Sequence, residues 1–369
     1  MRRRNQQLLQ EAIVRRIRRR KALIKERNIL KAHRRRILNS SAINKHSSNR
    51  SKIQNITVQL AEDFRLLTQP DIVLKTIRDL SKIKNNTTSR QHIYLNLQNV
   101  KHLDIGSLSM LLAVVNSYKS NISVIGNYPL NHNCYQFFVD SGFLDHMKSI
   151  QGKKPEKKNP NNLMLQRGFD KTSNHKIGLE VRHAVKHLTG TENSYRPVFS
   201  IIQEMCANSI EHANVSKQDK NWLVTLYYTD DKVIFTMIDI GKGILATLRK
   251  KVSQVIKDTL SIKTDLGTLI GAFDKKYQSS TFDDNRNKGL PRIQDTNNYD
   301  FIENLVVITN NVFLDFTNKE KSKELKTKFN GTFYYWELTK NCIAERCSYG
   351  ARGSIRRISR RKYRQGRRS

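Results

Sequence analysis

The sequence predicts an α/β protein of two successive modules with basic segments at both ends. Segments of strand and helix character alternate through residues 57–150, and a second set occupies residues 178–340. At 369 residues the chain is long enough for two domains, each able to bury a core. The Lys-, Pro- and Asn-rich stretch at 151–162 is expected to be extended and exposed, and we place a linker at residues 151–177.

The first module contains a loop with Asp104 between a predicted strand and a predicted helix. Strands are expected over residues 56–64, 92–100 and 121–127, and helices near 70–82, near 106–119 and over 133–147. The stretch LNLQNVKHLDIGSLSMLLAVV, which holds the loop, resembles the STAS domain, the small module of anti-sigma antagonists and sulfate transporters. The resemblance implies a STAS-like mixed sheet with helices, and a protein partner.

Modules of that family often carry a regulatory serine two residues after the aspartate. This chain has Gly106 at that position, and Ser107 is displaced by one residue. A partner kinase would therefore need Ser107 or Ser109 as a substitute.

Residues 201–213 read IIQEMCANSIEHA and predict an amphipathic helix. Its apolar residues recur at helical spacing: Ile201, Ile202, Met205 and Ile210. Glu204, Asn208 and His212 follow one another at every fourth position, so they share one face of the helix. Mg²⁺ takes oxygen ligands, so the Asn208 carbonyl oxygen together with ATP phosphates would suit it. Glu204, one turn earlier, is placed to polarise an attacking water or hydroxyl.

A strand is expected from Lys232 to Asp239, and Gly241 and Gly243 follow it. A carboxylate such as Asp239 accepts a hydrogen bond from the exocyclic amine of adenine, which guanine lacks at that position. The two glycines remove Cβ atoms where the backbone must approach a ligand closely. Together with the carboxylate and carboxamide of the preceding helix, this pattern indicates a purine-nucleotide site.

Two later segments extend this site. Lys288 and Gly289 belong to a glycine turn bracketed by cations, which suits phosphates at the start of a helix. The residues Asn330, Gly331 and Thr332 open another expected strand, and Thr332 would supply a hydroxyl beside Asp239.

Residues 178–340 resemble the GHKL ATPase superfamily, which is shared by gyrase, heat-shock chaperones, sensor histidine kinases and mismatch-repair proteins. The matching positions are Glu204 and Asn208 (N box), Asp239, Gly241 and Gly243 (G1 box), Gly289 (G2 box), and the terminal Gly331 and Thr332. The N-box sequence EMCANSIEHA is most similar to that of the branch that contains anti-sigma serine kinases.

This resemblance implies a Bergerat-type α/β sandwich that binds ATP and Mg²⁺. By this resemblance, Glu204 is the catalytic or water-orienting base and Asn208 is the Mg²⁺ ligand. Asp239 is the residue that recognises adenine. Lys288 stands where the family has the first glycine of the G2 box. Residues 245–288 correspond to the mobile ATP lid of the family, and they carry no clear fold signal.

The net charge of +35 is concentrated at the ends of the chain. Residues 1–56 hold 18 Lys and Arg against two Glu, and they are expected to form a basic, partly amphipathic helix. Residues 341–369 hold ten Lys and Arg against one Glu and are expected to be disordered. Such arms favour nucleic acid as a partner. An anionic membrane surface, an acidic protein, or no defined partner remain alternatives.

Cysteine use and hydropathy favour a reduced, cytoplasmic protein. The four cysteines form neither a zinc pattern nor a disulfide pattern, and Cys206 is expected to be a small buried apolar group. No apolar stretch reaches the length of a membrane span, and no secretory signal peptide is visible.

Two classes of function follow from these observations. In the first, the chain is an ATP-binding regulatory protein whose nucleotide state controls partner or nucleic-acid binding, with slow ATP hydrolysis or protein-serine phosphorylation. In the second, it is a nucleic-acid-binding or scaffold protein with a degenerate, non-hydrolysing ATPase fold. A histidine kinase proper is disfavoured, because no phospho-acceptor helix precedes residue 178.

Overall fold

The computed structural model describes residues 54–83, 90–118, 120–147, 154–168, 174–212, 221–251, 264–274 and 289–344. The predicted basic arm and Arg-rich tail lie almost entirely outside these residues, as does Lys288. The described residues fall within one compact unit. Its α/β class agrees with the prediction. Among them, no helix combines the length and the apolar character that a membrane span requires.

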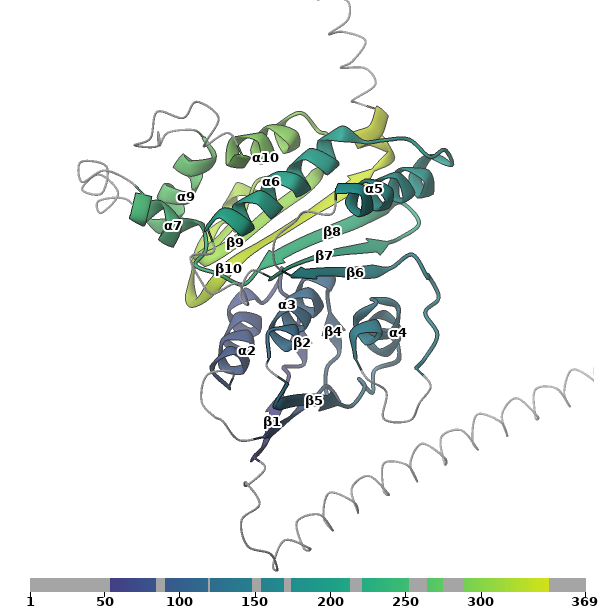
Figure 1. Cartoon of the computed structure of the whole chain (residues 1–369), viewed down its shortest axis with the longest axis vertical. Coiled ribbons are helices and arrows are strands. Elements are labelled where there is room, and N and C mark those ends of the chain that lie inside the picture. The colour runs from purple at the N-terminus through teal and green to yellow at the C-terminus, as the bar shows by residue number, and fades with distance from the viewer. Residues whose placement is uncertain are drawn as a thin grey trace, which may run out of the picture. The chain divides into compact units, whose positions relative to one another are not determined.

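A three-stranded parallel sheet with the strand order β1-β3-β5 forms the N-terminal region of this unit, and Figure 1 labels its two outer strands. Its strands are β1 (Gln54–Gln59), β3 (Gln91–Asn96) and β5 (Ile122–Gly126), and a short parallel pair joins β2 (Asp63–Phe64) to β4 (His102–Leu103). The helices are α2 (Pro70–Ile83), α3 (Ile105–Asn116) and α4 (His132–Asp140), followed by the 3₁₀ turn η2 (Phe143–His146).

The mixed sheet expected for this region is wrong for the described strands, because every pairing in it is parallel. The connections explain the difference: α2 lies between β1 and β3 in the sequence, and α3 lies between β3 and β5. A helical crossover returns the chain to the end of the sheet where the previous strand began, so the next strand runs in the same direction.

Asp104 fixes the start of α3. Its side chain accepts a hydrogen bond from Ser107 N at 2.7 Å and another from Leu67 N at 3.0 Å. It is therefore an N-cap that also holds the loop before α2. Residues on every side of α3 are buried, as expected for a helix enclosed between two layers.

A five-stranded antiparallel sheet forms the C-terminal region, with the strand order β6-β7-β8-β10-β9. The strands are β6 (Leu163–Gly168), β7 (Asn221–Tyr228), β8 (Lys232–Asp239), β9 (Glu303–Asp315) and β10 (Lys323–Thr339), with the turn η4 (Lys319–Lys321) before β10. The helices are α5 (Asn174–Thr189), α6 (Arg196–His212), α7 (Ile244–Lys251), α9 (Asp265–Phe273) and α10 (Gly289–Asn298). Two of them, α7 and α9, lie in the stretch for which the sequence carried no clear fold signal.

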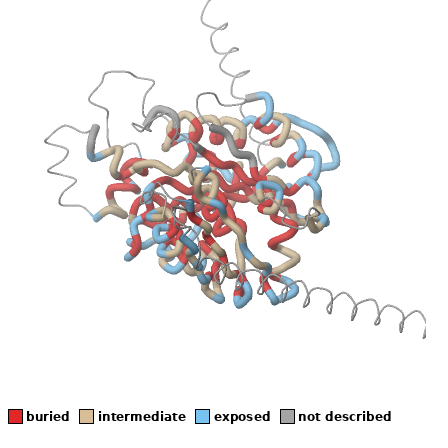
Figure 2. Tube along the Cα trace, turned by 60° about the horizontal axis from the view of Figure 1, so that its bottom comes forward, coloured by how far each residue is buried: buried red, intermediate tan, exposed pale blue. Residues whose placement is uncertain are grey.

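The two faces of this sheet have different coverings. Helices α5, α6 and α10 cover one face (Figure 1), and its core includes Trp336 stacked on Phe235 with ring centroids 5.3 Å apart. Helices α2 and α3 of the N-terminal region cover the other face, where Ile238 and Phe333 join their core. Figure 2 shows the buried residues running through the middle of the unit. The two regions therefore share a hydrophobic core.

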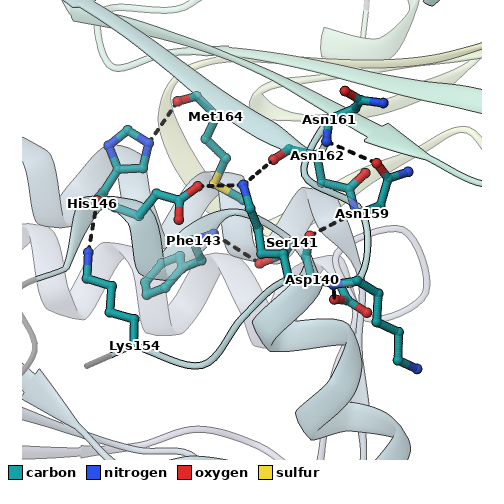
Figure 3. Close-up of polar contacts among 12 residues, drawn as sticks. Asp140, Ser141, Phe143, His146, Lys154, Asn159, Asn161, Asn162 and Met164 are labelled. Carbon is teal, nitrogen blue, oxygen red and sulfur yellow. Dashed lines mark hydrogen bonds and ion pairs between the residues drawn. The ribbon is translucent and has the colours of Figure 1, made fainter.

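The segment between the two regions is anchored at its C-terminal end (Figure 3). Asn162 is 1% exposed, and its amide nitrogen donates to the Asp140 carbonyl oxygen at 2.8 Å. Its amide oxygen accepts from Tyr228 N at 2.7 Å. Lys157 donates to the Asn162 carbonyl oxygen at 2.8 Å. The expectation of an exposed segment is thus wrong at Asn162, because this side chain satisfies backbone groups of both regions.

Candidate functional site

Helix α6 presents the predicted N-box residues above the sheet. Ile201, Ile202 and Met205 are each at most 1% exposed and fix one face of the helix on the core. Glu204 and Asn208 are half-buried on another face, as the spacing predicted. Cys206 is fully buried, and burial raises the pKa of its thiol to about 12, which agrees with a small apolar role.

The start of α10 lies directly against these two side chains. A Cβ atom at Gly289 would lie 3.1 Å from Glu204 Oε2 and 3.5 Å from the Asn208 amide nitrogen. A larger residue at this position would push the carboxylate away by a few tenths of an ångström. The structure therefore brings Glu204, Asn208 and Gly289 together, although Gly289 lies more than 80 positions after the other two in the sequence.

Glu204 is not free. Arg292, one turn into α10, forms an ion pair with its carboxylate through Nη1. The Arg292 side chain is 54% exposed and that of Glu204 is 27% exposed. Sequence reasoning missed Arg292, because only the fold brings the first turn of α10 opposite Glu204.

Asp239 ends β8 and lies opposite Thr332 of β10 in the antiparallel register. The backbone N–H of Thr332 donates to Asp239 Oδ1 at 2.7 Å, and the hydroxyls of Ser209 and Thr332 also hydrogen-bond to this carboxyl group. Burial raises the pKa of Asp239 to about 6, and these donors oppose that rise. A carboxylate offers about four acceptor positions, so the three donors among the described residues leave one for a further donor.

The glycines near Asp239 serve different purposes. Gly243 has a φ of +78°, and a Cβ atom there would lie 2.6 Å from Asn310 Oδ1. At Gly331, with a φ of +151°, a Cβ atom would lie 2.2 Å from the Asp239 carbonyl oxygen. Both positions therefore require glycine for the fold. A Cβ atom at Gly241 would meet none of the described residues within 4 Å, so this position borders open space in the described part of the chain.

Two buried residues of β9 hold the loop after Asp239, and sequence reasoning missed both. Thr309 accepts from Ile244 N at 2.9 Å through its hydroxyl. Asn310 accepts from Leu245 N at 3.1 Å and donates to the Lys242 carbonyl oxygen at 2.9 Å. These bonds tie the start of α7 to the sheet. The available signal was the polar run Thr309, Asn310 and Asn311 between two apolar stretches of the strand.

The two serines of α3 are enclosed by the same unit. Ser107 and Ser109 are both 0% exposed. Ser109 Oγ lies 2.9 Å from Thr225 Oγ1 and 2.8 Å from Thr236 Oγ1, and Ser107 Oγ donates to the Asp104 carbonyl oxygen at 2.9 Å. Neither hydroxyl is open to a kinase in this arrangement, so the expected substitutes for the regulatory serine are inaccessible.

The predicted site residues thus gather in two groups beside α6. The first contains Glu204, Asn208 and Gly289, and the second contains Asp239, Gly243 and Thr332. Ser209, next to Asn208 in the sequence, joins the groups through its hydrogen bond to Asp239. Comparison with protein-family models, with curated proteins and with solved structures finds no match to this chain.

Proposed function

We propose that the chain is an ATP-binding regulatory protein. Mg-ATP would bind beside α6, and its presence would change what the rest of the chain can bind. The observation that supports this most strongly is the convergence of separate segments: Gly289 abuts Glu204 and Asn208, while Ser209 and Thr332 hold Asp239. A helix carrying a carboxylate and a carboxamide, next to a strand-end aspartate, suits a nucleotide with a cation.

Each group supports one part of the ligand. The remaining acceptor position of Asp239 suits the exocyclic amine of adenine, and an ionised carboxylate strengthens that bond. Asn208 would hold Mg²⁺ through its amide oxygen, with phosphate oxygens and waters as the other ligands. The open space at Gly241 leaves room for a ligand beside the strand end.

Glu204 is the residue in this group that could accept a proton from an attacking water or from a serine hydroxyl. Its ion pair with Arg292 engages the carboxylate, so that pair must open before Glu204 acts as a base. Slow ATP hydrolysis or phosphoryl transfer to a protein serine is therefore the chemistry we propose for this site.

The same ion pair favours a second candidate function, in which nucleotide binds without turnover. Lys288, in place of a glycine, also fits this alternative. The chain would then be a scaffold that binds nucleic acid through its basic ends, with the nucleotide as a structural ligand. Turnover and phosphotransfer assays on the purified chain separate the two candidates, since the scaffold shows neither.

Calorimetric titration of the full chain with ATP and with GTP, each with Mg²⁺ and with EDTA, tests the proposal directly. We expect ATP to bind in a Mg²⁺-dependent manner and GTP to bind much more weakly, because guanine places a carbonyl where adenine has its amine. Asn208→Ala should remove the Mg²⁺ dependence. Equal affinity for the two nucleotides would refute the role given to Asp239.

The proposed nucleic-acid partner is tested by deleting residues 1–56, which carry a net charge of about +16. The deletion should weaken DNA or RNA binding and flatten its dependence on salt, because fewer counterions are released. An unchanged slope would show that this arm is not the contact. Binding to anionic vesicles but not to nucleic acid would replace the nucleic-acid partner with a membrane surface.

A further inference from the structure

Arg292 is the one cation that the described residues show bonded to the N box. It lies on the first turn of α10, three residues after Gly289, and residues three apart on a helix point in similar directions. Because Gly289 lies against both Glu204 and Asn208, the guanidinium of Arg292 belongs to the same small region as the proposed Mg²⁺ ligand.

The ion pair between Arg292 and Glu204 is easily exchanged. The arginine side chain is 54% exposed, and ion pairs at such positions add little net stability because water competes for both groups. A phosphate group carries more charge than a carboxylate, and guanidinium binds it through two parallel hydrogen bonds. A phosphate held near Asn208 would therefore compete successfully for Arg292.

We infer that Arg292 exchanges Glu204 for the terminal phosphate of a bound nucleoside triphosphate, and that it is the residue that distinguishes ATP from ADP. This inference rests on the proposed function. Before nucleotide binds, Arg292 engages Glu204. With a triphosphate bound, Arg292 contacts the terminal phosphate, and Glu204 is released at the position where a water or hydroxyl would approach. A diphosphate lacks the terminal group, so the original ion pair persists.

If Arg292 is exchanged in this way, ATP affinity should respond to a substitution of Glu204. An arginine with only a structural role would not give this response. Glu204 and the phosphate compete for one guanidinium, so weakening the carboxylate should strengthen triphosphate binding. Glu204→Gln should raise ATP affinity a few-fold in the wild-type background and leave it unchanged when Arg292 is absent. ADP affinity should not respond in either background.

The test measures ATP and ADP affinity by calorimetry with Mg²⁺ on the full chain and its variants. The wild type should prefer ATP by about tenfold or more, which is the size expected for one hydrogen bond to a charged group. Arg292→Ala should remove that preference by weakening ATP binding, with ADP affinity changed less than about twofold. Arg292→Lys should keep part of the preference, because it retains the charge but not the two-bond geometry.

Arg182→Ala is the matched control, since Arg182 forms an exposed ion pair with Glu192 elsewhere on the chain, with Nε and Oε1 3.5 Å apart. It should leave both affinities unchanged, and unchanged thermal unfolding of every variant shows that the fold persists. A wild type that binds ATP and ADP, with the same preference surviving in Arg292→Ala, would overturn this inference alone. A wild type that binds no adenine nucleotide would overturn the proposed function as well.

Discussion

Both faces of the five-stranded sheet are packed on apolar cores, but the α6 face also carries half-buried polar side chains beside its core. On the α6 face, Glu204 and Asn208 are half-buried, and Glu204 shares its carboxylate with an exposed arginine. On the opposite face, α3 packs so closely that a Cβ atom at Gly106 would lie 3.0 Å from the ring of Phe333. Charged groups with exchangeable partners suit a ligand, whereas dense apolar packing suits a permanent contact.

Adjacent residues of one strand show the same contrast. Thr332 supports the carboxylate of Asp239, and Phe333, the next residue of β10, is fully buried in the core shared with α3. Successive strand residues point to opposite faces, so one position serves the candidate site and its neighbour serves stability. Substitutions on the two faces should therefore have separable effects.

The largest effect is expected from Phe333→Ala on the α3 face. Removing a fully buried aromatic ring leaves a cavity and should lower the free energy of unfolding by about 3–5 kcal/mol. Denaturant unfolding measures this change. Leu130→Ala, at a position 71% exposed, should shift it by less than about 0.5 kcal/mol. A small change for Phe333→Ala would contradict the tight packing of this face.

Asp239→Asn, on the α6 face, should show the opposite pattern. Nucleotide affinity should fall about 10- to 100-fold, because a hydrogen bond to a charged acceptor is lost. Stability at neutral pH should not fall, since burial disfavours the carboxylate and the amide oxygen can still accept from Thr332 N. Calorimetry and thermal unfolding of the same variant provide the two readouts. A destabilised variant with normal affinity would make Asp239 a structural residue.

Ser109→Ala tests the polar group within the apolar face. The change leaves the hydroxyls of Thr225 and Thr236 with one partner fewer and should cost on the order of 1–2 kcal/mol of unfolding free energy. Replacing both threonines by valine in the same variant should recover part of the loss, because the unpaired hydroxyls are removed as well. Nucleotide affinity should not respond, and a response would show that the two faces are coupled.

A pH dependence is also expected from Asp239. Its pKa is raised from 3.8 to about 6 in the folded chain, so the folded state binds more protons than the unfolded state between these values. Its contribution to stability therefore decreases as pH rises through this window and is constant above it. The proposed contact with adenine uses the ionised form, so affinity should increase with pH up to about 6, by at most about tenfold per unit. Calorimetry across this range should find a flatter profile for Asp239→Asn.

Local signals in the sequence predicted much of this fold and most of the proposed site. The helix at Glu204, the strand ending at Asp239 and the helix near 70–82 were predicted from periodicity, which depends on local backbone geometry. Arg292, Thr309 and Asn310 were missed because their partners come from distant segments. The burial of Ser109 likewise depends on a sheet more than 100 residues away.

The core that α3 shares with the large sheet also limits how this protein can be divided. A fragment cut in the 151–162 segment would retain Leu223, Ile238 and Phe333 without the helices that enclose them. Such a face is an apolar patch that promotes aggregation. The two halves should therefore be expressible only together, and supplying the missing half in trans should rescue solubility. A gene fusion that carries this protein into another chain would therefore have to include both halves together.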